Sequence, residues 1–174
     1  MILFVEIIIG IVLFTFLVVP NVLKAPLNWI GDYPPEIRKR CVKLGLIEDS
    51  KKRFSKKEIV KKGIACIVMP LILALIMYRI NGANSFIDGF VESFIIWLAI
   101  TWYDAIVLDC LWFCHSKKVQ IPGTEDMPEY KDYLFHIKQS FIGTALGVPV
   151  CLIVGLCVTL FSSVSRVIEQ NNGE

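Results

Sequence analysis

The stretch that decides the fold is residues 102–138, which read WYDAIVLDCLWFCHSKKVQIPGTEDMPEYKDYLFHIK. Its first part is apolar but carries two aspartates, Asp104 and Asp109. A polar segment with a Pro-Gly pair follows, and a second apolar run begins just after residue 138. An apolar run that stops at a polar link and then resumes is typical of two membrane-spanning helices joined by a loop.

Long apolar blocks make up most of the chain. Residues AVILMFWYC account for 55% of it and the mean hydropathy is +0.62, which is more than a soluble domain of this length needs. A helix that crosses a membrane needs about 20 largely apolar residues. Four blocks meet this requirement: 2–23, 63–80, 86–113 and 141–161. We expect an all-α integral membrane protein, 1–174, forming one transmembrane domain with links at 24–62 and 114–140.

The positive charges predict the orientation of the spans. The link 24–62 carries twelve of the 18 Lys and Arg residues and the link 114–140 carries four, whereas Arg79 and Arg166 lie at the opposite side. Cytoplasmic loops carry an excess of Lys and Arg. We therefore expect both links in the cytoplasm, both termini outside, and a multi-pass protein of the cell (inner) membrane. No Lys or Arg precedes Ile2, so we expect an uncleaved span and not a signal peptide.

A short helix is predicted within the first link, after Pro34-Pro35. Ile37, Cys41 and Leu44 recur at helical spacing between basic residues. This pattern indicates a helix that lies along the membrane surface. Its cations either bind anionic lipid or only enforce the topology. The link lacks the aromatic and basic platform of a nucleic-acid-binding surface, so we expect no nucleic acid as a partner.

Small residues recur at every fourth position of the last span. The stripe consists of Gly143, Gly147, Cys151, Gly155, Thr159 and Ser163. Such a pattern lets two helix backbones approach closely. It faces either another span of the same chain or its copy in an oligomer. Besides the lipid bilayer, we expect a homo-oligomer through this span as the partner.

Asp104 and Asp109 are the clearest candidates for function. An ionisable group within a span costs about 2.5–3.5 kcal/mol on insertion scales, so its presence calls for a reason. Each aspartate either belongs to a functional polar site or pairs locally with a neighbouring helix or a Lys. On an ideal α-helix, residues five apart are turned by about 140°. The two aspartates therefore need not share one site.

The link that follows combines a turn with a polar helix. Pro122-Gly123 fits the centre of a type II turn, which needs positive φ at its second central residue. Beyond it, Glu129, Asp132 and His136 stand at i, i+3 and i+7, so one helix would carry them on one side. A carboxylate and a histidine at i, i+4 can hold a metal ion. The face is either such a site, for a divalent metal, or a solvated surface.

Antiparallel spans would bring the polar groups of this link to one cytoplasmic rim, with Asp104 deeper. We expect the following side chains there: Asp104, Asp109, Glu125 and His136 as catalytic groups, Thr124, Tyr130, Tyr133 and His115 as ligand-binding groups, and Asp109, Asp132 and His136 as metal ligands. This convergence assumes that the third and fourth spans are neighbours.

The same region carries a resemblance to known proteins. The residues concerned are Asp104, Asp109, Pro122, Gly123, Thr124, Glu125, Tyr130 or Tyr133, and His136. This order resembles the signature of a family of small four-span bacterial membrane proteins. The resemblance implies four spans and marks this constellation as the place to look, but it implies no chemistry by itself.

Three functions fit the sequence. The first is a polar site at the cytoplasmic interface that binds or acts on an amphiphilic or small ligand by acid–base or metal-assisted chemistry. The second is a subunit of an oligomeric transporter or channel, with Asp104 and Glu92 along one path. The third is a non-catalytic accessory protein. The chain has no standard nucleophile, phosphate-loop or nucleotide motif, so enzymatic activity stays open.

Overall fold

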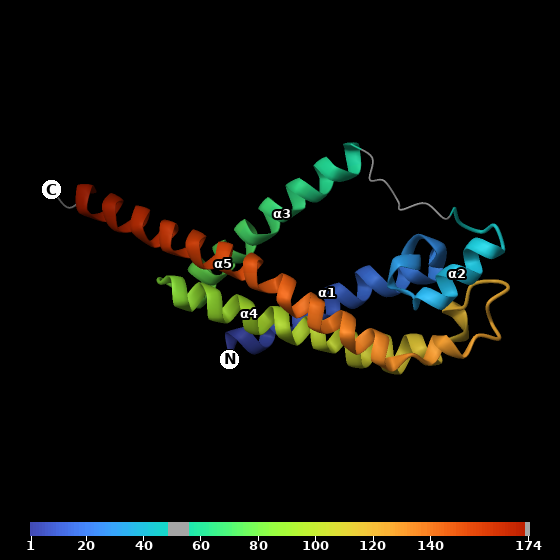
Figure 1. Ribbon diagram of the computed structural model, residues 1–174. Coiled ribbons are helices and arrows are strands. Elements are labelled where there is room, and N and C mark those ends of the chain that lie inside the picture. The colour runs from blue at the N-terminus through green and yellow to red at the C-terminus, as the bar shows by residue number, and fades with distance from the viewer. Residues whose placement is uncertain (49–55, 173–174) are drawn as a thin grey trace. The chain divides into compact units, whose positions relative to one another are not determined.

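The structure is a computed structural model that describes residues 1–48 and 56–172 (Figure 1). Its main helices are α1 (Ile2–Lys24), α2 (Pro35–Lys43), α3 (Lys56–Ile76), α4 (Phe86–Tyr103) and α5 (Tyr133–Asn172). The described part contains helices, turns and loops and no strand. Part of the predicted basic link, including Lys51, Lys52 and Arg53, lies outside the described residues.

Four helical stretches are long and apolar enough to cross a membrane, as predicted: Ile2–Lys24, Gly63–Asn81, Phe86–His115 and Tyr133–Asn172. The first three agree with the predicted blocks to within a few residues. The fourth was predicted at 141–161 and is much longer at both ends. Hydropathy marks where a helix is apolar, whereas a helix continues until its hydrogen-bonding pattern ends. The residues assigned to the end of the second link therefore belong to α5.

The described residues fall into two compact units. One unit contains residues 1–7, 56–99 and 143–172, and the other contains 8–48 and 100–142. Helices α1, α4 and α5 each contribute to both units.

In the first unit, α4 packs on α5 through small residues of both helices. A Cβ atom at Gly89 would lie 3.1 Å from Cα of Gly155, and one at Gly147 would overlap the Trp97 indole. The Trp97 Nε1–H donates to the carbonyl of Gly143 (3.0 Å). The predicted small-residue stripe of the last span thus meets a helix of the same chain. It gives no separate support for the expected homo-oligomer.

The connection between α3 and α4 is a glycine turn followed by a helix cap. The helical stretch Met77–Asn81 ends at Gly82, whose φ of 75° is left-handed and favours glycine. Ser85 then begins α4: its Oγ accepts the Asp88 N–H (3.2 Å), while Asp88 Oδ2 accepts the Ser85 N–H (3.2 Å). This reciprocal arrangement is a capping box, so Asp88 has a local structural role.

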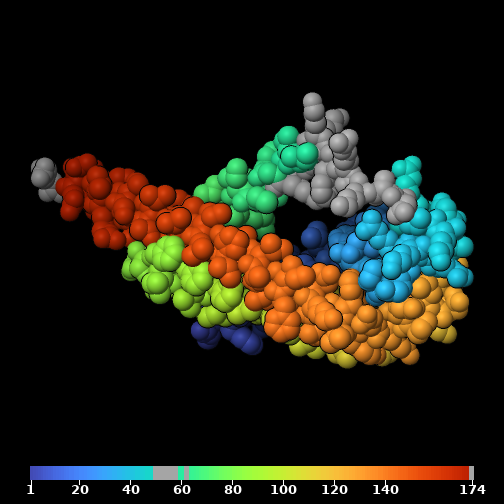
Figure 2. Space-filling view, viewed as in Figure 1, coloured from blue at the N-terminus to red at the C-terminus, as the bar shows by residue number. Residues whose placement is uncertain are grey.

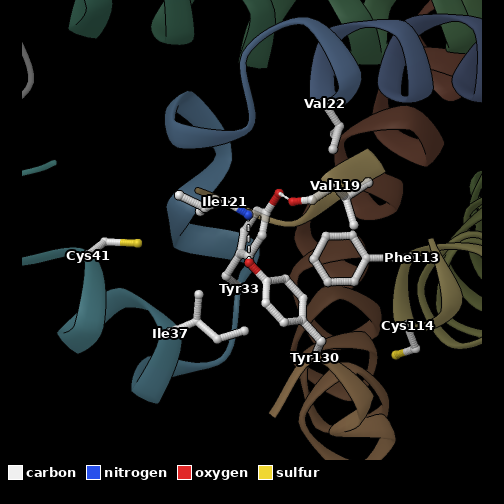
Figure 3. Packing of buried hydrophobic residues seen from close by; sticks show 9 residues of the cluster. All are labelled: Val22, Tyr33, Ile37, Cys41, Phe113, Cys114, Val119, Ile121 and Tyr130. Atoms are coloured by element: carbon white, nitrogen blue, oxygen red, sulfur yellow. Dashed lines mark hydrogen bonds between the residues drawn. The ribbon is translucent and has the colours of Figure 1, made fainter. Parts of the chain in front are cut away.

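The second unit has a small core around Tyr33 (Figure 3). The Tyr33 ring lies edge-on to Phe113 at 4.8 Å between centroids and to Tyr130 at 6.1 Å, and its hydroxyl donates to the Val119 carbonyl (2.8 Å). The remaining members come from α1, α2 and the link after α4: Val22, Ile37, Cys41, Cys114 and Ile121. This core fastens α2 to residues 113–130, and the surfaces of the two segments meet in Figure 2.

The predicted short helix in the first link is present as α2, with Pro35 at its first position. Its apolar side does not face outward, however. Ile37 and Cys41 are completely buried in the Tyr33 core, whereas Leu44, just beyond the helix, is exposed. An amphipathic helix binds a membrane surface by burying its apolar face there. Since the chain itself covers that face, the side of α2 that stays exposed is mainly charged and carries its basic residues.

Close packing of α1 on α4 completes the second unit. A Cβ atom at Gly10 would lie 2.8 Å from Cδ1 of Ile100, so the helices nearly touch. Further along, the Thr15 hydroxyl donates to the Ile11 carbonyl (2.8 Å) and lies 3.0 Å from the Tyr103 hydroxyl. Because the single Thr15 proton is already used, Tyr103 is the donor to Thr15. This bond fixes the end of α4 at the residue before Asp104.

Candidate functional site

Asp104 and Asp109 stand on one side of the helix because the helix changes its winding between them. Residues Asp104–Trp112, which continue α4, form a π-helix. Its hydrogen bonds join i to i+5, so residues five apart lie one above the other, as residues four apart do in an α-helix. The separation of about 140° expected for an ideal α-helix therefore does not apply. π-Helical segments are rare in proteins overall, and those that occur are often found at functional sites.

Asp109 contacts His136 of α5. The distance between Asp109 Oδ2 and His136 Nδ1 is 3.2 Å. The two side chains, which were both expected at one rim, thus meet, and both lie in the second unit. A carboxylate accepts hydrogen bonds only, so a neutral His136 ring places its proton on Nδ1 in this geometry. The carboxylate fixes both the tautomer and the orientation of the ring.

The environment of His136 is apolar on two sides. Its ring lies edge-on to Phe113 (5.2 Å between centroids) and to Phe135 (5.3 Å). The residue is 2% exposed, and its Nε2 atom is buried without a hydrogen-bond partner among the described residues. An unpaired buried polar atom is costly, by about 1–3 kcal/mol. The chain therefore presents Nε2 as an unused hydrogen-bonding position.

The predicted helical row of Glu129, Asp132 and His136 does not exist. Glu129 belongs to a separate 3-10 turn, Pro128–Lys131. Asp132 precedes α5, and its Oδ1 accepts the N–H of Phe135 (2.9 Å), as an N-cap residue does. The sequence pattern was correct in spacing, but capping by Asp132 separates the 3-10 turn from α5. Only His136 of the three contacts Asp109.

A further carboxylate, that of Asp32, lies within range of the charges of Asp109 and His136, and no sequence pattern pointed to it. Part of Asp32 reaches solvent, yet the protein around it raises the pKa of its carboxyl, and the nearby charge of Asp109 raises this pKa further. Asp104 also lies within range of the charges of Asp109, Asp32 and His136. Asp32 has no pattern of its own in the sequence. Its place depends on Tyr33, the next residue, which the core holds.

Thr124, Tyr130 and Glu125 hold the turn of the link. The Thr124 N–H donates to the Ile121 carbonyl (3.0 Å) and Gly123 has φ of 86°, as predicted for the Pro-Gly turn. The Tyr130 hydroxyl accepts the Ile121 N–H (2.8 Å) and lies 2.7 Å from the Thr124 hydroxyl. The Thr124 hydroxyl donates to the Ile121 carbonyl (2.7 Å), and Glu125 Oε2 accepts the Gly123 N–H (2.8 Å). Burial raises the pKa of Tyr130, which favours the protonated donor.

The remaining predicted ligand-binding residues form a separate pair. The Tyr133 hydroxyl lies 3.3 Å from His115 Nε2, and both side chains are exposed. His115 Nδ1 also lies 3.1 Å from the Leu111 carbonyl. Neither residue contacts Asp109 or His136 within hydrogen-bonding distance in the described part of the chain. The expected rim is therefore divided into an Asp–His site, a structural turn and an exposed His–Tyr pair.

The predicted metal site does not fit the arrangement. Asp109, Asp132 and His136 do not converge, because Asp132 is used as a helix cap. Across residues 1–48 and 56–172, no group of three or more His, Cys, Asp and Glu side chains is placed to hold a metal ion. Direct coordination of a metal by three protein ligands normally needs such a group. The site is better described as an imidazole held by one carboxylate, that of Asp109, with Asp104 and Asp32 within range of its charge.

A second polar cluster lies in the first unit. Asn81 Nδ2 donates to Glu6 Oε2 (3.0 Å) and to Glu92 Oε2 (2.9 Å). The atoms Glu6 Oε1 and Asn81 Oδ1 are buried without a hydrogen-bond partner among the described residues. Glu92 was expected to line a transport path if the chain forms an oligomeric conduit. Asn81, which donates a hydrogen bond to Glu92, was predicted only as part of the turn between the second and third spans.

No model of a protein family, no curated protein and no solved structure matches this chain at a significant level.

Proposed function

We propose that this chain is a multi-pass membrane protein that binds a small or amphiphilic ligand at a site formed by His136, Asp109, Asp104 and Asp32. The observation that carries the proposal concerns the buried Nε2 atom of His136, which has no hydrogen-bond partner in residues 1–48 and 56–172, while the other ring nitrogen lies 3.2 Å from Asp109. If this atom had only a structural role, giving it a hydrogen-bond partner or removing it would stabilise the folded chain. A ligand that bonds to Nε2 removes the cost.

The same geometry supports proton exchange with the bound ligand. Asp109 holds the proton of a neutral ring on Nδ1, which leaves Nε2 as an acceptor. The carboxylate also stabilises the imidazolium that forms when Nε2 takes up a proton. A histidine arranged in this way acts as a general base in many enzymes. The sequence carries no standard nucleophile motif beside this histidine, and we propose binding and proton exchange at the site.

The placement of the site in the membrane follows from the charge distribution. The two links carry sixteen of the 18 Lys and Arg residues, and cytoplasmic loops carry this excess. We place both links in the cytoplasm and both termini outside, in the cell membrane. Asp32 lies in the first link and His136 near the beginning of α5, which opens the site toward the cytoplasmic side. Attaching a reporter to either terminus and testing its accessibility in intact cells checks this orientation.

Native mass spectrometry of the full chain in detergent tests the proposed site. The wild type is compared with Asp109→Ala and with Asp126→Asn, a matched control in which an exposed carboxylate of the link is neutralised. We expect a bound species in the wild type and in the control but not in Asp109→Ala. A protein without any bound species in all three samples, or a species retained equally in Asp109→Ala, would contradict the proposal.

A second candidate function is a subunit of a cation conduit. The observation in its favour is the cluster of Glu6, Asn81 and Glu92, where one buried carboxylate oxygen and one buried amide oxygen lack partners within the described part of the chain. Oxygen-lined positions with excess negative charge mark ion pathways in membrane proteins. Cation flux into vesicles containing the protein tests this function. If the chain is a conduit, flux should fall in the Glu92→Gln variant. It should persist in Asp88→Asn, because the Asp88 carboxylate only caps α4.

A further inference from the structure

The helix α2 carries a concentration of positive charge between residues 38 and 43. Its basic side chains are all exposed: Arg38, Lys39, Arg40 and Lys43. The helix contains one acidic residue, Glu36. Among the described residues the one salt bridge joins Asp109 and His136, so none of the α2 cations is paired there. The helix therefore has an excess of positive charge that the described part of the chain leaves uncompensated.

The packing of α2 fixes the direction of these cations. Ile37 and Cys41 are completely buried and point from α2 into the Tyr33 core (Figure 3). On a helix with 3.6 residues per turn, Lys39 and Lys43 stand on the side opposite to these two residues. The two lysines are four positions apart, so they are neighbours on one face, where like charges repel each other. An anion bound between them would remove this repulsion.

The same core holds α2 at the level where the spanning helices end. Val22 lies in the last turn of α1, and Phe113 lies near the end of the spanning stretch that begins with α4. Both are buried in the core that contains Ile37 and Cys41 of α2. Half-buried Trp29 and Trp112 pack against this core, and tryptophan is enriched where a membrane meets water. The exposed face of α2 is therefore held at the level of the lipid headgroups.

This placement distinguishes between the anionic partners that a basic helix attracts. Single-stranded nucleic acids bind by stacking their bases on aromatic side chains, and α2 contains no aromatic residue. Anionic phospholipids already lie at the level of the helix, and basic residues near the membrane surface attract their headgroups. The charge and the location of α2 together favour the lipid.

We infer that the exposed face of α2 binds the phosphate headgroups of anionic phospholipids, with Lys39 and Lys43 at its centre and Arg38 and Arg40 on either side. Ammonium and guanidinium groups donate charge-assisted hydrogen bonds to phosphate oxygens. The apolar side of α2 is covered by the chain, so the binding is electrostatic and weakens as salt increases. None of these four residues belongs to the Asp109–His136 site, and the inference does not depend on the function proposed above.

Native mass spectrometry of the full chain in neutral detergent tests the inference. Phosphatidylglycerol, which is anionic, and phosphatidylcholine, which has no net charge, are titrated separately, and the bound lipid molecules are counted. We expect phosphatidylglycerol to bind at the lower concentration. One cation near the surface contributes about fivefold in affinity, so Lys39→Gln combined with Lys43→Gln should weaken the binding of phosphatidylglycerol by about tenfold or more.

Two control variants separate a site on α2 from a general effect of charge. Lys39→Arg with Lys43→Arg keeps both charges and should bind phosphatidylglycerol as the wild type does. Arg79→Gln with Arg166→Gln removes the same number of charges from the other unit and should also leave this binding unchanged. Because Lys39 and Lys43 are exposed, the unfolding midpoint without lipid should be the same in the wild type and in both α2 variants.

Several results would overturn the inference. Equal affinity for the two lipids, or equal affinity of the wild type and the Lys→Gln double variant for phosphatidylglycerol, would show that α2 does not select anionic lipid. A loss as large in the Arg79 and Arg166 variant, or in the Lys→Arg variant, would contradict a charge-based site on this helix. Glycerol 3-phosphate or a short oligonucleotide that displaces phosphatidylglycerol at an equal concentration would assign the face to a soluble anion or to nucleic acid.

Discussion

Replacing Tyr130 by Phe removes one hydroxyl from the turn that supports the site. This hydroxyl accepts the buried Ile121 N–H (2.8 Å) and, since the Thr124 proton is already donated to the Ile121 carbonyl, donates to Thr124 (2.7 Å). The ring contacts with Tyr33 and Phe113 involve carbon atoms and remain in the variant. The loss is therefore confined to two hydrogen bonds in a residue that is 3% exposed.

The expected magnitude follows from the group that is left unpaired. A buried N–H without a partner costs about 1–3 kcal/mol, while Thr124 keeps its bond to the backbone. We expect Tyr130→Phe to lower the free energy of unfolding by an amount in this range, measured by denaturant titration in mild detergent. Tyr133→Phe is the matched control, because its hydroxyl is exposed and meets only His115 at 3.3 Å. A change within about 0.5 kcal/mol is expected there. Equal effects of the two substitutions would refute the structural role assigned to Tyr130.

Three further predictions concern packing, charge and capping. Gly147→Ala should destabilise the chain because its methyl group would overlap the Trp97 indole, whereas Gly63→Ala, with no neighbour within 4 Å, should be neutral or stabilising; unfolding titrations compare them. The pKa of Asp32 is raised in the folded chain above its ordinary value of 3.8. Protonated Asp32 therefore favours the folded state below pH 3.8, and this contribution to stability is lost as pH rises through the raised pKa. Asp32→Asn should therefore stabilise the chain at neutral pH and flatten the pH dependence of unfolding. Ser85→Ala should cost about 0.5–2 kcal/mol through loss of the α4 cap, and an unchanged midpoint would contradict that role.

The spans were predictable because apolar composition directly reports the solvent around a helix. The close α4–α5 contact followed in part from the spacing of Gly147 and Gly155, since small residues every four positions permit close approach. Composition does not name the partner, so the choice of α4 over a second copy needed the contact with Trp97. The Pro-Gly turn was predictable because its second residue requires positive φ.

The site was predictable only in part. Asp109 and His136 were identified as charged and titratable groups near the ends of neighbouring spans, and their contact depends on the antiparallel order. The common face of Asp104 and Asp109 was not predicted, because the π-helix that creates it depends on tertiary packing. Asp32 was missed for a similar reason, since Tyr33 places it through contacts with residues distant in the sequence.

The most direct test of the account is the protonation pattern of the two histidine rings, His115 and His136. Nitrogen NMR of the histidine-labelled chain in micelles, with His115→Gln for assignment, distinguishes Nδ1–H from Nε2–H in a neutral ring. Neutral His136 should carry its proton on Nδ1, and Asp109→Ala should change this preference while leaving His115 unaltered. A His136 ring protonated on Nε2, or one indifferent to Asp109→Ala, would contradict the site.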